Sequence, residues 1–190
     1  MHGKGNMKYG SGEEYAGDWV QDIRVGYGTL VEDDRYSTYT GDFWDDQRWG
    51  YGTMKYGDDT VYTGFYERHE RHGIGRQTFP EGHPTNLVYY DGEWAFDHMC
   101  GVGGALYRDG SMYDGGWKLD YRRGERFGRL SRGVVKSDGG DVYEGELYMG
   151  QRVGWGKCVY ANGDRYEGNW TEDKRGGGKG LFEQLSVANG

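Results

Sequence analysis

Large apolar residues recur along this chain at alternate positions, separated by glycines and short polar stretches. A Tyr-x-Gly-x-aromatic segment at 15–19 is followed by a Gly-x-Gly-x-apolar segment at 26–30. Alternation with a period of two is typical of a β-strand, because successive side chains point to opposite faces. The six residues between the two segments fit a hairpin loop. Each pair of segments therefore predicts one antiparallel β-hairpin.

The two-segment pattern repeats along nearly the whole chain. Turn-forming pairs such as Asn162-Gly163 join successive copies. The sequence thus predicts an all-β array of seven hairpins with one lone strand before them, over residues 1–182, and a tail or the start of a further repeat at 183–190. The first tyrosine of the pattern stands at seven positions, 23 to 30 residues apart: Tyr15, Tyr39, Tyr62, Tyr90, Tyr113, Tyr143 and Tyr166.

Glycines and aromatic residues share one face of the predicted strands. A glycine in a strand leaves a gap the size of a side chain, and a nearby aromatic ring can lie over the bare backbone. A single-layer sheet has no second layer to bury its side chains, so these rings must supply the burial. We therefore expect most tyrosines and tryptophans to form the scaffold.

Three copies depart from the pattern. In the third, the apolar position slips from Gln77 to Phe79. In the fifth, the second glycine is assigned to Gly128, with Arg126 in place of the first. In the sixth, Leu147 replaces the aromatic residue. This assignment gives two long links, at 79–88 and 131–141, which we expect to protrude from one flank of the sheet as a paired clamp beside a groove.

The motif Tyr-x-Gly-x-Trp, then Gly-x-Gly-x-Leu or Met, then Asn/Asp-Gly, resembles the MORN-repeat family over about residues 3–182. The opening copies look most like the small MORN proteins of cilia and sperm. The resemblance implies an elongated, twisted, single-layer antiparallel sheet with a groove along one face. It also implies a non-enzymatic scaffold, in the cytoplasm at cytoskeletal, ciliary, flagellar or membrane junctions.

On this interpretation a protein partner, as a helix or an extended segment, lies along the aromatic groove. The acidic residues Asp42 and Glu93 would select a basic partner. The predicted aromatic contacts are the exposed edges of Tyr39, Phe43, Tyr62, Tyr66, Tyr90, Trp94, Tyr113 and Trp117.

Composition narrows the classes of partner. The formal net charge is -8 and the pI about 5.1, which argues against nucleic acid. The segment 118–136 is locally basic, and the alternative function is a phosphoinositide or membrane adaptor that uses this patch. Its arginines are Arg122, Arg123, Arg126, Arg129 and Arg132. Unpaired strands at the two ends of the array would also favour end-to-end self-association, or a place within a longer array.

We expect no catalytic site, cofactor or metal. His69 and His72 fall in a hairpin loop without a second pair of ligands. The acidic turn at 137–141 does not match a calcium-binding loop, and the glycine-rich 176–180 lacks the context of a phosphate loop. Cys158 takes an apolar strand position, so we expect a packed and unreactive thiol.

Overall fold

A computed structural model describes residues 1–33, 36–122, 131–148, 151–176 and 180–184. The chain divides into two compact units, Met1–His98 and Met99–Gly190. All regular structure in the described residues is β-strand. The prediction of an all-β, antiparallel hairpin fold is therefore confirmed.

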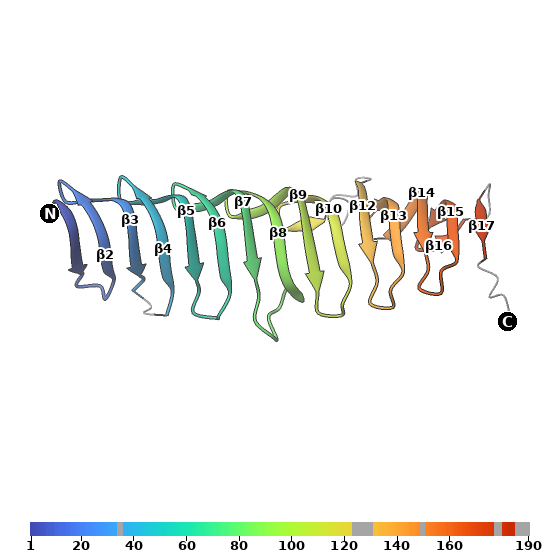
Figure 1. Cartoon of the computed structure of the whole chain (residues 1–190), viewed down its shortest axis with the longest axis horizontal. Helices are drawn as coiled ribbons and strands as arrows, with labels where there is room; N and C mark the ends of the chain where they lie inside the picture. Colours follow the sequence, from blue (N-terminus) through green and yellow to red (C-terminus); the bar gives the residue numbers. More distant parts are fainter. Residues whose placement is uncertain (34–35, 123–130, 149–150, 177–179, 185–190) are drawn as a thin grey trace. The chain divides into compact units, whose positions relative to one another are not determined.

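The first unit is a single antiparallel sheet in which each strand pairs with the next one along the chain (Figure 1). The lone first strand takes the place of a returning hairpin arm, as expected. The strands are β1 (Gly3–Lys8), β2 (Glu14–Val20), β3 (Ile23–Val31), β4 (Thr38–Trp44), β5 (Gln47–Lys55), β6 (Val61–Glu67), β7 (Glu70–Thr78) and β8 (Leu87–Ala95).

The second unit continues the same plan, but two of its returning arms are interrupted. β10 pairs with the short β11 and then with β12, and β15 pairs with the short β16 and then with β17. The strands are β9 (His98–Tyr107), β10 (Met112–Lys118), β11 (Tyr121–Arg122), β12 (Ser131–Lys136), β13 (Val142–Tyr148), β14 (Gln151–Val159), β15 (Arg165–Thr171), β16 (Lys174–Arg175) and β17 (Leu181–Glu183).

The fifth copy is aligned differently from the sequence prediction. Gly115 pairs with Gly133, just as Gly17 pairs with Gly28 in the first hairpin. The second glycine of this copy is therefore Gly133 and not Gly128. Residues 123–130, which follow β11 in the chain, lie outside the described residues, and the predicted protruding link at 131–141 is instead strand β12 and an ordinary turn. The prediction of a paired clamp was wrong, because 137–141 is an ordinary turn and, of the two predicted links, 79–88 alone is long.

The third copy also keeps its register. Gln77 lies opposite Tyr62, the place that Met54 takes opposite Tyr39, so the apolar position does not slip to Phe79. Gln77 is buried and its side-chain carbonyl accepts a hydrogen bond from Arg71. A polar side chain occupies this position because the neighbouring arginine satisfies it.

The tyrosine that opens the copy lies over a pair of glycines in six copies, those of Tyr15, Tyr39, Tyr62, Tyr113, Tyr143 and Tyr166. A Cβ atom added to Gly28 would stand 2.4 Å from the Tyr15 hydroxyl oxygen, and one added to Gly52 would stand equally close to that of Tyr39. In all seven copies the hydroxyl donates a hydrogen bond of 2.8–3.3 Å to the carbonyl three residues further on. The prediction that rings pack on glycine is confirmed, and burial raises the pKa of Tyr15 to about 12.

The first glycine of Gly-x-Gly has a different role from the second. Gly26 and Gly50 have φ of +59° and +65°, in the left-handed region that favours glycine, where each returning strand carries a bulge. The Asp42 carboxylate accepts a hydrogen bond of 3.0 Å from the Tyr51 N–H at this bulge. The bulge therefore turns the residue between the glycines outward, away from the tyrosine side.

Edge-to-face ring pairs link one hairpin to the next in the first unit. The series Trp19, Tyr15, Phe43, Tyr39, Tyr66, Tyr62, Trp94 and Tyr90 has neighbouring centroids 5.0–5.2 Å apart. We call this side of each sheet the ring face. In the second unit, Leu147 stands in the series where the other described copies have a ring, and a cavity of about 200 Å³ is lined by Leu147, Tyr143 and Val135 among others.

Candidate functional site

The eight aromatic residues predicted to contact a partner are buried on the ring face. Their exposed fractions are between 0 % and 4 %, so the exposed edges that the sequence suggested are not offered to solvent. All eight belong to edge-to-face ring pairs, six of them in the series of the first unit, while Tyr113 pairs with Trp117 in the second unit. Partner binding by these residues stays a prediction, and their observed role is packing.

Arginines cover the ring face of the first unit. The guanidinium carbons of Arg24 and Arg48 lie 5.6–5.9 Å from the ring centroids beneath them, and that of Arg71 lies 4.3 Å from the Trp94 ring. Glu13 and Glu32 each accept a hydrogen bond from one of these arginines, at 2.7–2.8 Å. A cation between an aromatic ring and a carboxylate is stabilised from both sides. The ring face is therefore covered by arginines and the carboxylates paired with them.

The opposite face of the first unit exposes a row of large apolar side chains, which we call the outer row. It consists of Tyr27, Tyr51, Phe65 and Ile74, with exposed fractions of 58 %, 52 %, 48 % and 56 %. Tyr51 lies opposite Phe65 on the paired strand, and their rings meet edge to face at 5.3 Å. The row runs from β3 to β7, four strand spacings or roughly 19 Å.

Both predicted acidic contacts lie beside this row. Asp42 is opposite Tyr27, and Glu93 is opposite Ile74. The structure therefore separates Asp42 and Glu93 from the eight buried aromatic residues and places them beside the outer row. The row was not predicted from the sequence, although a signal was present. The residue between the two glycines is bulky in most copies, and period-two alternation puts it on the face opposite to them.

The predicted basic patch is only partly described. Arg123, Arg126 and Arg129 lie outside the described residues. Arg122 is in β11, at the register position opposite Trp117. Arg132 is exposed on β12 and lies opposite Glu146, an acidic neighbour on the paired strand. Lipid binding by this segment stays a prediction.

Net charge differs between the two units. Residues 1–98 hold 18 of the 31 acidic residues and 9 of the 23 lysines and arginines, a formal charge of -9. Residues 99–190 therefore carry a formal charge of +1. The outer row lies on the strongly acidic unit.

Other chemistry finds little support in the described part of the chain. No group of three or more His, Cys, Asp or Glu residues there is arranged to hold a metal ion, and no helix there is long and apolar enough to cross a bilayer. His69 lies in a hairpin turn, where burial and the nearby Arg48 and Arg24 lower its pKa. Burial also raises the pKa of the Cys158 thiol, as expected for a packed side chain.

Comparison with known proteins finds relatives that share part of this sequence. Alsin from Homo sapiens and from Pan troglodytes is 27 % identical over 168 residues, which cover 87 % of this chain and 10 % of each relative. The ALS2 C-terminal-like protein of Mus musculus is 30 % identical over 78 residues, 39 % of this chain and 8 % of the relative. The chain thus spans about a tenth of the length of these relatives.

Solved structures also match the chain. One is the SAS-4 (dCPAP) TCP domain of Drosophila melanogaster in complex with a proline-rich motif of Ana2 (dSTIL), with a TM-score of 0.39 and 13 % identity. The match covers 88 % of this chain and 90 % of that one. The TCP10 domain of Danio rerio CPAP matches with a TM-score of 0.32 and 13 % identity, over 91 % and 89 % of the two chains.

The MORN repeat family matches six segments that together make up more than half of the chain: 15–31, 39–61, 62–83, 90–112, 143–165 and 166–177. Residues 113–142, which the family model leaves unmatched, contain the fifth copy, whose returning arm is interrupted. MORN repeats generally mediate protein or membrane interactions. This match, together with the hairpins, the glycine pairs and the tyrosines that lie over them, shows that the chain belongs to the MORN-repeat family.

Proposed function

We propose that this chain is a non-catalytic interaction scaffold that binds an extended basic segment of a protein partner across the outer row of its first unit. The observation that carries the proposal is the exposure of four large apolar side chains in one row, on a sheet face whose acidic neighbours include Asp42 and Glu93. Exposed apolar patches of this kind mark interaction sites.

The chemistry of the row selects the partner. A lysine or arginine side chain gains from contact with the face of Tyr27 or Tyr51 and from a carboxylate beside it. The formal charge of -9 on residues 1–98 attracts a basic segment and repels an acidic one. The partner is therefore a segment in which lysines or arginines alternate with apolar residues. A cytoskeletal or ciliary place for the complex stays a prediction.

The test is binding of a short blocked peptide of alternating Lys and Val, followed by calorimetry and by backbone amide shifts. The double variant Tyr51→Ser/Phe65→Ser should weaken binding at least tenfold, because it removes the central ring pair. Both side chains are half exposed, so the folded state should persist. The matched control is Trp155→Ser, which changes the same position of the motif in the second unit.

A second pair of variants separates charge from apolar contact. Asp42→Asn keeps an oxygen that can accept from the Tyr51 N–H, and Glu93→Gln keeps the shape of the side chain. Together the two substitutions should lower the affinity for the Lys/Val peptide several-fold and leave the affinity for a Ser/Val peptide unchanged. Amide shifts confined to the ring face or to the second unit, or equal binding by the double variant, would refute the proposal.

A further inference from the structure

Three arginines of the ring face each hold the aspartate in the turn of the next hairpin. In the first copy, Arg24 donates from its backbone N–H to Asp46 Oδ1 at 2.9 Å, from Nε to the same oxygen at 3.3 Å and from Nη2 to the Asp46 carbonyl at 3.1 Å. Arg71 makes the same three bonds to Asp97. Arg152 makes them to Asp173. The fold therefore builds an arginine–carboxylate clasp that is repeated between hairpins.

Arg175 stands at the corresponding position of the last described hairpin. It lies opposite Trp170, as Arg24 lies opposite Trp19. Its guanidinium carbon is 4.8 Å from the ring centroid of Phe182 and 6.0 Å from that of Tyr160. Unlike the three clasped arginines, Arg175 has no carboxylate within ion-pair distance among the residues that the structure describes.

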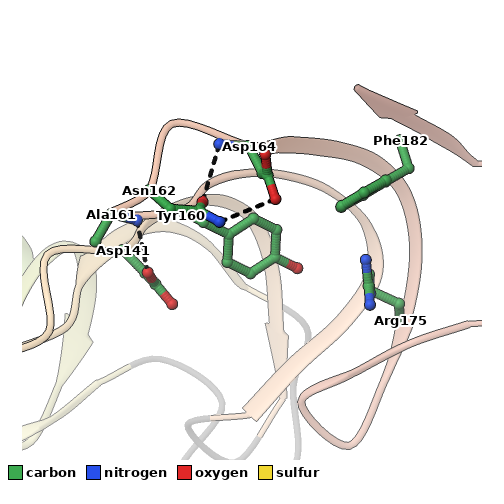
Figure 2. Close-up of a pocket in the computed structure, with 7 residues that line it drawn as sticks. All are labelled: Asp141, Tyr160, Ala161, Asn162, Asp164, Arg175 and Phe182. Carbon is green, nitrogen blue, oxygen red and sulfur yellow. Dashed lines mark hydrogen bonds between the residues drawn. The ribbon is translucent and has the colours of Figure 1, made fainter. Parts of the chain in front are cut away.

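Arg175 is exposed, and a cavity of about 390 Å³ that is open to solvent lies beside it. Figure 2 shows Arg175 and Phe182 on one side of Tyr160, and the turn that holds Asn162 on the other. A second cavity, of about 470 Å³, is lined by the three cations Arg152, Lys174 and Arg175 together with the acidic Asp141 and Asp173.

The acidic residues of the cavity are already engaged. Asp141 Oδ1 accepts a hydrogen bond of 2.9 Å from the Ala161 N–H. Asp164 Oδ2 accepts one of 3.0 Å from the Asn162 amide. Arg175 is the cation that lines the first cavity, and its two acidic neighbours there are hydrogen-bonded to neutral donors.

We propose that this cavity binds the carboxylate of an aspartate or glutamate side chain carried by an acidic peptide segment of a protein partner. The guanidinium of Arg175 takes the carboxylate through two N–H groups, the geometry that arginine favours for this ligand. Phe182 and Tyr160 contact the apolar part of the bound residue. Asp141 and Asp164 limit the site to one carboxylate, since a second would meet like charge. This site is separate from the outer row and selects the opposite charge.

The probe is a short blocked peptide of Asp, Gly and Ser, with the matching peptide in which Asn replaces Asp. The readout is the Nε–Hε signal of Arg175 in an NMR titration, with the affinity from calorimetry. The Asp peptide should shift that signal and bind at least ten times more tightly than the Asn peptide. Arg175→Gln should lower the affinity at least tenfold, and Arg175→Lys should lower it by a smaller factor because the paired donors are lost.

Arg165→Gln is the matched control, since it removes one exposed positive charge from β15, outside the two cavities that Arg175 lines. Its affinity for the Asp peptide should equal that of the unchanged protein. Equal binding of the Asp peptide by Arg175→Gln would overturn the proposal. So would acetate or inorganic phosphate shifting the Arg175 signal at the same concentration as the peptide, because the site would then take any small anion.

Discussion

At the scale of single residues, the glycine beneath each tyrosine leaves room for the ring over the backbone. A Cβ at position 52 would stand 2.4 Å from the Tyr39 hydroxyl oxygen and 2.5 Å from two carbons of the same ring. Gly52→Ala should therefore lower the free energy of unfolding by about 2–3 kcal/mol, the cost of overpacking a rigid site. Gly10→Ala is the control, since an added Cβ there meets nothing within 4 Å. Urea unfolding measures both, and equal effects would contradict this account.

His69 stands where three other described copies place the aspartate that clasps an arginine. The Nε atom of Arg48 is buried without a hydrogen-bond partner among the described residues, because the turn offers it no carboxylate. His69→Asp should supply one and raise the stability by about 1 kcal/mol. The reverse change, Asp97→His, should lower it by about as much in the Arg71 copy. Chemical unfolding of both variants checks the pair, and a shift of the same sign in both would contradict it.

The same histidine gives a pH dependence. Burial, with Arg48 and Arg24 nearby, lowers the folded-state pKa of His69 below its ordinary value of 6.5. The unfolded chain then binds the proton more readily than the folded chain below about pH 6.5, so protonation favours unfolding. Stability should fall as the pH drops from 7 towards 5, and by less in His69→Asn. Identical pH profiles of the melting temperature in the two proteins would argue against this role.

At the scale of a hairpin, Leu147 interrupts the series of ring contacts and borders a cavity of about 200 Å³. Leu147→Phe should place a ring edge to face against Tyr143 and raise the stability by about 1 kcal/mol. Leu147→Ala should lower it by about 2–4 kcal/mol, since the residue is 2 % exposed. Thermal unfolding compares the three proteins. A loss of stability in Leu147→Phe would mean that the cavity cannot admit a ring.

Element by element, the sequence predicted more of the scaffold than of the surfaces. Tyr15 above Gly17 and Gly28 follows from alternation alone, because the pattern fixes both the strand and the face. The register of the fifth copy could not be predicted from the sequence. Gly128 and Gly133 fit the motif equally well, and only strand pairing distinguishes them. The arginine–aspartate clasp was missed for a similar reason. Arg24 and Asp46 lie 22 residues apart, and only the stacking of hairpins brings them together.

The candidate contacts were predicted only in part. The sequence identified Asp42 and Glu93, but it joined them to rings such as Tyr39 that lie on the other face. In a single-layer sheet, one aromatic row supplies the burial and cannot also be the exposed contact surface. The residue between the glycines, as in Tyr51, was the better indicator of an exposed row.

At the scale of the whole chain, the charges of the two units predict different responses to salt. Residues 1–98 carry a formal charge of -9 and residues 99–190 one of +1. A strong field speeds the arrival of an oppositely charged ligand and is screened beyond about 8–10 Å at physiological salt. The association rate of the Lys/Val peptide should therefore fall about tenfold between roughly 50 and 500 mM salt, with its dissociation rate nearly unchanged.

The Asp peptide meets a nearly neutral unit, where a single arginine and its immediate neighbours do the binding. Its association rate should change by less than about threefold over the same range, because no long-range field steers it. Stopped-flow or surface-based kinetics on the full chain measures both slopes. The control is a measurement with both peptides present. Because their sites lie on different units, each peptide should associate at the rate measured for it alone. Equal slopes would show that the asymmetry of charge between the units does not govern recognition.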